Sequence, residues 1–183
     1  MESVFESNDI SSFMIRVVSA DDALEIAAIY NHYVEHTTIS FETEVVDVDE
    51  MRCRIDDVSS IYPYFVSVDD DGRIEGYCYA HRWKERAAYH ATLETTVYLR
   101  PDCCGRGLGR KLMNRLIGEC RVRGVHVLIA CITADNHASV ALHKCLGFEA
   151  VSHFREVGCK FGRRLDVIDM ELLIYAAICR AAC

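Results

Sequence analysis

Three glycines at alternate positions, Gly105, Gly107 and Gly109, lie between a strand-like segment and an amphipathic helical segment. Glycine has no Cβ, so its backbone amides can approach an anion closely, and the N-terminus of the following helix adds about half a positive charge. The spacing fits neither a P-loop, G-x-x-x-x-G-K-(S/T), nor the dinucleotide fingerprint G-x-G-x-x-G, which would need a glycine where Leu112 stands. The turn therefore predicts a phosphate site of another kind. A tight turn beside a solvated helix face is the structural alternative.

The charge of the chain argues against a general nucleic-acid binder. The sequence has 28 acidic and 20 basic residues, a formal net charge of −8, whereas nucleic-acid binders carry a basic excess. The segment from Arg100 to Gly124 departs from this average, with seven basic side chains against two acidic ones. This local excess suits an anionic ligand at the glycine turn.

The glycine turn resembles the acetyl-CoA-binding segment of GNAT acetyltransferases, whose pattern (Q/R)-x-x-G-x-(G/A) lies between a strand and a helix. The corresponding frame runs from Cys104 to Gly109, with cysteine in place of glutamine or arginine. The resemblance implies that backbone amides of this frame bind the pyrophosphate of acetyl-CoA, and that Cys104 weakens the affinity without abolishing it. The cofactor-binding residues that it implies are Val97, Tyr98, Leu99, Cys104, Gly105, Arg106, Gly107, Leu108, Gly109, Arg110, Asn136 and Ser139.

A second segment, Asn136 to Phe148, is similar to the one that follows the fifth strand in the same family. An asparagine there contacts the pantetheine arm, which implies this role for Asn136. The position of His143 usually holds a tyrosine that can protonate the departing thiolate, so the resemblance implies that His143 is the acid. A core histidine bonded to the backbone is the alternative.

The stretches IYNHYVEHTTISFETE and ETTVYLRPDCCGRGLGRKL resemble phosphinothricin N-acetyltransferases and their relatives that acetylate methionine sulfone or sulfoximine. Those enzymes carry a glutamate in an E-(H/S/T)-T-V-Y-V strand, matched by Glu94, and a histidine matched by His143. An α-amine is mostly protonated at neutral pH, so a base must remove a proton before the nitrogen attacks a thioester. Glu94 is the candidate base, with a pKa raised by burial in the sheet; an exposed surface residue is the alternative. Backbone amides between Val97 and Leu99 would stabilise the oxyanion, as the resemblance implies.

The loop AHRWKERAAYHAT matches the basic and tyrosine positions that phosphinothricin-type enzymes use near the substrate, with Lys84, Arg86 and Tyr89. Arg86 can hold a carboxylate with two parallel hydrogen bonds, and Lys84 adds a point charge. Phe41 and Glu42 are expected to form the opposite wall. Without the resemblance, this segment would be interpreted as a solvated charged loop.

Hydrophobic periodicity predicts a mixed α/β order, and the resemblance implies the GNAT fold, a mixed splayed sheet flanked by helices. The first helix, capped within 19–22 and ending at His36, is expected to bury Leu24, Ile26, Ala27 and Tyr30. An Asp-Gly turn at 69–72 predicts a hairpin. The expected strands cover 13–18, 64–68, 73–80, 91–99, 125–132, 148–157 and 165–174, and the further helices cover 46–61, 108–124 and 136–146.

Length and composition favour one compact domain, because 183 residues with 51% hydrophobic side chains can form a core. We expect the domain over 13–175, a disordered extension over 1–12 and a tail over 176–183. Neither a membrane span nor a signal peptide is visible, which predicts a soluble cytoplasmic protein. None of the ten cysteines forms a C-x-x-C pair, so the sequence predicts no metal site and reduced core thiols such as Cys131.

These features together predict an enzyme that transfers acetyl from acetyl-CoA to the α-amine of a small amino acid or analogue. No nucleic-acid or membrane partner is expected, and a homodimer is left open because relatives are commonly dimers. One alternative is a GNAT enzyme for another amine, such as an antibiotic, a polyamine or a protein N-terminus, although the cations Lys84 and Arg86 argue against polyamines. A non-catalytic acyl-CoA sensor would have lost Glu94 and His143, and a nucleotide-binding module would need the missing P-loop spacing.

Overall fold

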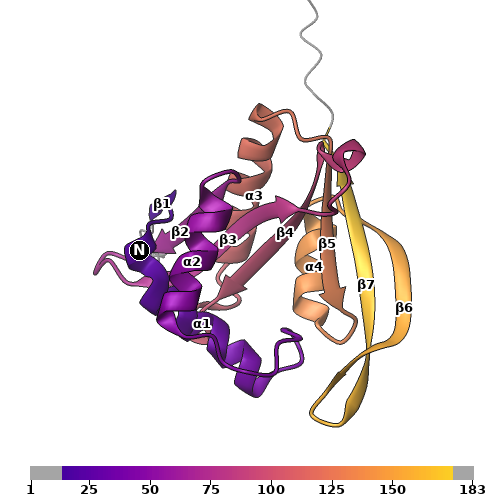
Figure 1. Cartoon of the computed structure of the whole chain (residues 1–183), viewed down its shortest axis with the longest axis horizontal. Coiled ribbons are helices and arrows are strands. Elements are labelled where there is room, and N and C mark those ends of the chain that lie inside the picture. Colours follow the sequence, from indigo (N-terminus) through magenta and orange to yellow (C-terminus); the bar gives the residue numbers. More distant parts are fainter. Residues whose placement is uncertain (1–13, 175–183) are drawn as a thin grey trace, which may run out of the picture.

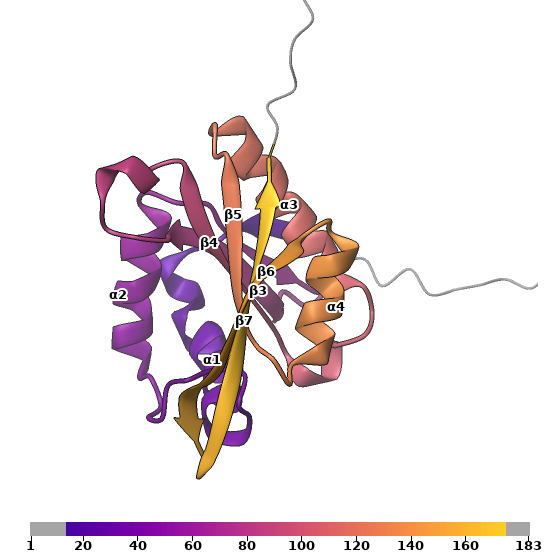
Figure 2. The same ribbon diagram turned by 90° about the vertical axis from the view of Figure 1, so that its right-hand side faces the viewer.

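The computed structural model describes residues 14–174, so the expectations for 1–12 and 176–183 lie outside the described residues. One seven-stranded mixed sheet runs through this part in the order β1-β2-β3-β4-β5-β7-β6. Helices α1 and α2 cover one face of the sheet and α3 and α4 cover the other (Figure 1, Figure 2). The strands are β1 (Met14–Val17), β2 (Tyr64–Val68), β3 (Ile74–Arg82), β4 (Thr92–Leu99), β5 (Val127–Thr133), β6 (Glu149–Lys160) and β7 (Arg163–Leu173). The helices are α1 (Ala23–His36), α2 (Val48–Ser59), α3 (Leu108–Val122) and α4 (His137–Cys145).

The start of α1 is fixed by the polar residues that the sequence marks as caps. Ser19 and Asp22 form a reciprocal capping box around a 3-10 turn over Ala20–Asp22. The carboxylate of Asp22 also accepts a hydrogen bond from each terminal nitrogen of Arg16, both at 2.7 Å, and these bonds join the helix start to β1. The expected burial of Leu24 is wrong, since 65% of this side chain is exposed. Each helical residue advances about 100° around the axis, which turns Leu24 away from the buried face that carries Ile26.

Most predicted elements are present, within a few residues of their expected ends. The Asp-Gly turn joins β2 and β3 as an antiparallel hairpin, with Gly72 at φ +80° and the Asp69 carboxylate accepting from the amides of Asp71 and Arg73. The expected mixed α/β fold is confirmed. No helix within 14–174 is long and apolar enough to cross a membrane.

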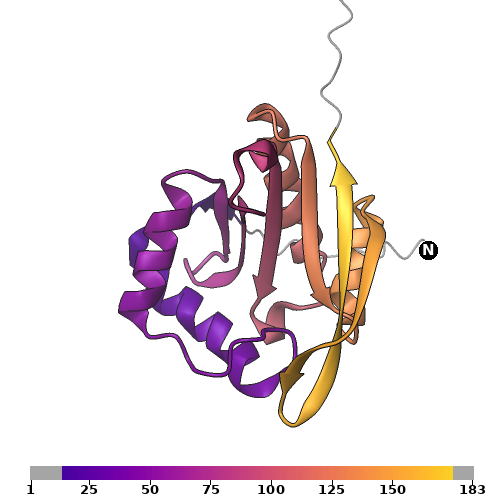
Figure 3. The ribbon, with the colours of Figure 1, turned by 45° about the vertical axis from the view of Figure 1, so that its right-hand side comes forward.

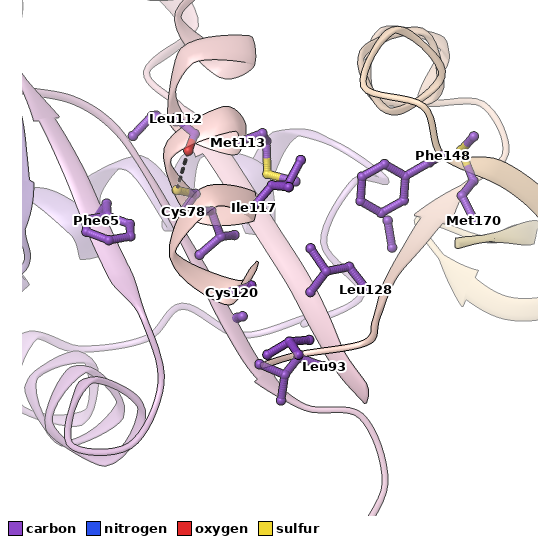
Figure 4. Close-up of a cluster of buried hydrophobic side chains, with 14 of the residues drawn as sticks. Phe65, Cys78, Leu93, Leu112, Met113, Ile117, Cys120, Leu128, Phe148 and Met170 are labelled. Atoms are coloured by element: carbon purple, nitrogen blue, oxygen red, sulfur yellow. Dashed lines mark hydrogen bonds between the residues drawn. The ribbon is translucent and has the colours of Figure 1, made fainter. Parts of the chain in front are cut away.

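Helix α3 forms the centre of the first hydrophobic core (Figure 4). Its side chains at four-residue spacing, Leu108, Leu112, Leu116 and Cys120, are all buried against the sheet, which is the stripe that the sequence predicts. The thiol of Cys78 on β3 donates to the carbonyl of Leu112 at 3.4 Å. A second core lies beneath α1 and α2 and is rich in tyrosine.

The eight cysteines within the described residues are free, but the expectation that most of them are core thiols is wrong. Cys131, offered as the example because it lies in an apolar run, is exposed. Its side chain lines a cavity beside the far end of β5, where β4 no longer covers the strand. Cys78, Cys103 and Cys120 are buried, Cys53, Cys104, Cys145 and Cys159 are exposed, and Cys179 and Cys183 lie outside the described residues.

Candidate active site

Strands β4 and β5 separate halfway along the sheet, and this opening organises the site. They pair in parallel only over Thr92, Leu93 and Glu94. Beyond this point β4 continues to pair with β3 as far as Leu99, while its other edge has no strand beside it. Figure 3 shows the strands and the helices that flank them, and in Figure 1 the two strands diverge towards the bottom of the view. The opening leaves backbone groups of β4 accessible to a ligand.

A cavity of about 510 Å³ lies at this opening and is called the central cavity below. It is lined from β3, β4, β5, β7, α4, the C-terminal half of α1 and the loop after α1. Residues that the sequence places at cofactor, substrate and catalytic positions are therefore brought together. They are Phe41, Glu42, Glu94, Val97, Tyr98, Asn136, Ser139 and His143.

Glu94 lies on β4 at the last residue that pairs with β5, with His81 as its neighbour on β3. Its side chain is partly buried. Burial raises the pKa of its carboxyl above the usual value, the charge of Asp169 on β7 raises it further, and His81 lowers it. A carboxylate with a raised pKa binds a proton more readily near neutral pH, which suits proton removal.

His143 is 3% exposed, and its ring lines the central cavity from α4. Its Nδ1 lies 2.8 Å from the backbone oxygen of Ser139. A carbonyl oxygen only accepts, so Nδ1 carries the proton and Nε2 is left as an acceptor in the neutral ring. The ring packs nearly at right angles to that of Phe148, and burial lowers the pKa of His143. His143 is therefore fixed to the backbone, as a core histidine would be, and its ring also reaches the central cavity.

Two different structural features account for glycine at the three positions of the turn. Gly105 and Gly107 both have φ +79°, a left-handed conformation that side chains strain. Gly109 lies inside α3, where a Cβ would come within 3.3 Å of Leu142 on α4 and 3.6 Å of Leu99. A Cβ at this position would therefore fit tightly, and the Leu142 side chain would have to move by a few tenths of an ångström.

Gly107 is the N-cap of α3 and supplies no side-chain acceptor to the amides of the first turn. These amides have no hydrogen-bond partner within the helix, so they can donate to an anion at its positive end. Around them Cys104, Gly105, Arg106 and Arg110 are exposed, whereas Leu108 packs in the core and contributes only backbone. The turn and the open edge of β4 thus fit a ligand with phosphates and an extended arm, as acetyl-CoA has.

The loop after α1 forms one side of the central cavity through Ile39, Ser40, Phe41 and Glu42, which we call the acceptor wall. The ammonium group of Lys160 donates to the carbonyl of Ser40 at 2.7 Å. The backbone at Gly158 leaves room for the Phe41 ring, since a Cβ there would lie 2.3 Å from Cε2 of that ring.

Sequence reasoning missed Lys160 and Gly158, because nothing local links a hairpin near residue 160 to a loop near residue 40. It also missed Arg54 of α2, whose Nη1 donates to Glu42 at 2.7 Å and so holds the acceptor wall on its other side.

The predicted substrate loop does not contribute to the lining of the central cavity. Lys84 and Arg86 are exposed, and Lys84 lies over the Trp83 ring at 3.9 Å from its centroid. The Tyr89 ring packs nearly at right angles to the same ring. The loop between β3 and β4 stands on the side of the sheet that carries α1 and α2 (Figure 2), which is also the side of the acceptor wall. Its place in substrate binding stays a prediction.

Within residues 14–174 no group of three histidine, cysteine, aspartate or glutamate side chains is arranged to hold a metal ion.

The chain matches the acetyltransferase (GNAT) domain over residues 15–169. It is 42% identical to phosphinothricin N-acetyltransferase of Alcaligenes faecalis over 159 residues, covering 86% of this chain and 80% of that protein. It is 39% identical to L-methionine sulfoximine/L-methionine sulfone acetyltransferase of Salmonella typhimurium, covering 86% of this chain and 92% of that protein. The solved structure of the yncA acetyltransferase from Salmonella typhimurium, which holds acetyl-CoA, matches with a TM-score of 0.87 at 37% identity, covering 94% of this chain and 100% of that one.

These comparisons confirm the predicted fold, the enzyme class and acetyl-CoA as co-substrate. The chain belongs to the GNAT acetyltransferase family.

Proposed function

We propose that this protein transfers the acetyl group of acetyl-CoA to the α-amine of a small amino acid of the phosphinothricin or methionine sulfone type. The observation that carries the proposal is the arrangement of Glu94 and His143 in one cavity at the opening between β4 and β5. The names of the relatives support the acceptor class.

The residues present fit acetyl-CoA. The first-turn amides of α3 and the left-handed turn at Gly105 and Gly107 would hold its phosphates, and the open edge of β4 and Asn136 would hold its arm. When bound, acetyl-CoA supplies a thioester carbonyl to be attacked by an amine. Backbone amides of β4 near Val97 and Tyr98 would donate to the oxygen on which negative charge develops.

Glu94 acts as the general base, directly or through a water molecule. Its carboxylate removes one proton from the acceptor ammonium and leaves a nucleophilic amine. The raised pKa matters here, because an ordinary carboxylate would bind the proton too weakly to help near neutral pH.

His143 needs a different role from that of a simple acid. Its pKa is lowered and Nδ1–H is bonded to Ser139, so the neutral ring offers the lone pair of Nε2. We assign to Nε2 the removal of the second proton from the attacking nitrogen. The ring then passes this proton to the departing thiolate sulfur. A free thiol has a pKa of about 8.5 and can leave as thiolate without help, so this contribution should be smaller than that of Glu94.

The charges of the cavity suit a cationic amine. Glu42 and Glu94 are its acidic lining residues, and no lysine or arginine is among the described residues that line it. The acceptor carboxylate therefore needs a cation from outside the lining, and Arg86 and Lys84 on the loop between β3 and β4 are the candidates. The cytoplasmic location and the homodimer stay predictions.

The test is release of CoA thiol from acetyl-CoA in the presence of single amines, with the acetylated product identified by mass. Methionine sulfone and phosphinothricin should be turned over, whereas spermidine and an amidated amino acid should react poorly. Preference for spermidine would move the protein to the polyamine alternative, and acetyl-CoA binding without turnover of any amine would favour the sensor.

A further inference from the structure

The side chain of Tyr33, in the last turn of α1, contacts the cofactor side of the site. Its hydroxyl donates to the backbone oxygen of Leu99, the last residue of β4, at 2.5 Å. Its ring lies 5.1 Å, between centroids, from the ring of Tyr98, which lines the central cavity. Burial raises the pKa of the Tyr33 phenol, and the neighbouring thiol of Cys104 raises it further. One side chain of α1 therefore lies against both the open edge of β4 and the first residue of the frame that holds the glycine turn.

The backbone of Tyr33 is bonded to the acceptor side. Its carbonyl accepts from the ammonium group of Lys160 at 3.4 Å, and the same ammonium donates to the carbonyl of Ser40 in the acceptor wall at 2.7 Å. Lys160 is the last residue of β6, so the hairpin of β6 and β7 reaches the end of α1 (Figure 1, Figure 3). The hydroxyl of Thr37 donates to the same Tyr33 carbonyl at 2.8 Å. The start of the acceptor wall is therefore attached to the residue whose phenol binds β4.

The ammonium group of Lys160 is buried without an ion pair. The residue is 3% exposed, and within residues 14–174 it forms no salt bridge. Burial lowers the pKa of Lys160, while the charge of Glu42 raises it. A buried charge is unfavourable unless hydrogen bonds compensate it, and here the acceptors are backbone oxygens at the negative end of α1 and in the acceptor wall. The charge of Lys160 therefore holds these two segments together.

We propose that Tyr33 and Lys160 are positioning residues that link the glycine turn and the edge of β4 to the acceptor wall, so that CoA and the acceptor amine strengthen each other's binding. The inference rests on the proposed acetyl transfer, which places the acceptor against this wall. A ligand bound at the turn restricts Cys104 and the end of β4, and the bonds of Tyr33 and Lys160 pass this restriction to Ser40. A second ligand that binds an already ordered site loses less conformational entropy. The link also fixes the distance between amine and thioester, on which the rate depends steeply.

The experiment measures the dissociation constant of methionine sulfone by calorimetry, with the protein alone and with the protein saturated with CoA. CoA carries no acetyl group, so the complex cannot react, and the ratio of the two constants is the coupling factor. In the unchanged protein this factor should be about five to ten, within the usual range for two coupled sites. Tyr33→Phe and Lys160→Met should each reduce it to about one to two, because each removes a hydrogen bond of the link. The affinity for CoA alone should stay within a factor of about three, since the glycine turn is unchanged.

Tyr62→Phe and Lys144→Met are the matched controls, because neither residue lines the central cavity and the Lys144 side chain is exposed. Both should keep the coupling factor of the unchanged protein. Linkage requires that saturating methionine sulfone tightens CoA binding by the same factor, which checks each measurement. Tyr33→Phe retains the ring and tests the link by itself if Lys160→Met does not fold.

A coupling factor of one in the unchanged protein, or the full factor in both linked variants, would overturn the link. Turnover of amino acids with either of these results would leave the proposed function standing. Absence of turnover with every amino acid would overturn the proposed function, and the link with it.

Discussion

The contact between Gly158 and Phe41 allows a direct test of the acceptor wall through Gly158→Ala. The new Cβ would lie 2.3 Å from Cε2 and 2.6 Å from Cζ of the Phe41 ring. Ordinary contacts between such atoms begin near 3.4 Å, so the ring must move by about 1 Å. Phe41 is 42% exposed and can swing outwards. The stability cost should therefore stay near the lower end of overpacking, about 1 kcal/mol, which lowers Tm by about 2–4 °C.

The kinetic effect of Gly158→Ala should be larger than its effect on stability. Displacement of the acceptor wall by about 1 Å can cost up to a hundredfold in rate when it misplaces a substrate. We expect KM for the amino acid to rise about tenfold while KM for acetyl-CoA stays within a factor of about three, because the glycine turn is unaffected. Steady-state assays of CoA release with each substrate varied in turn measure both values.

Gly118→Ala is the matched control, because a Cβ at this position of α3 meets no atom within 4 Å. It should leave both KM values unchanged and stabilise the helix by about 0.5–1 kcal/mol. The reasoning about the acceptor wall would be refuted if Gly158→Ala lowered Tm as expected but left KM for the amino acid equal to that of the unchanged protein.

Four further substitutions probe the cofactor turn, the base and the loop between β3 and β4. Gly107→Ala places a side chain at φ +79° and should lower the stability of the protein by about 1–2 kcal/mol. In melting scans acetyl-CoA should raise the Tm of this variant less than that of the unchanged protein. An equal rise in Tm would contradict the phosphate site. Glu94 must be ionised to act, so activity falls as pH drops through its pKa. Asp169→Asn removes a charge that raises this pKa and should move the acidic limb of kcat/KM to lower pH, whereas His81→Gln should move it to higher pH. Shifts of both variants in one common direction would argue against Glu94 as the base. Arg86→Ala should raise KM for the amino acid by about ten- to a hundredfold if the guanidinium holds the carboxylate, and an unchanged KM would leave this loop as solvated surface.

The elements that position the site could be predicted because their signals are local. Alternation in β4, four-residue spacing in α3 and the glycines between them are each contained within one short stretch of sequence. The capping residues Ser19 and Asp22 likewise mark the start of α1. Local patterns of this kind follow from backbone geometry and from burial of one face.

The parts that the sequence did not reveal depend on contacts between distant segments. Lys160 bonds to Ser40 across 120 positions, and no periodicity marks such a pair. Cys131 is misplaced for a related reason. An apolar run predicts burial on both faces, but α1 and α2 pack on β3 and β4, and the face of β5 at Cys131 is left open to the central cavity.

Glu94→Gln tests the central claim most directly, because the amide keeps the shape of the side chain and removes the base. We expect kcat to fall by roughly 10² or more at pH 7, with the affinity for acetyl-CoA nearly unchanged. The loss should shrink at high pH, where the amine loses its proton in solution. A kcat equal to that of the unchanged protein, or a loss that does not vary with pH, would contradict Glu94 as the general base.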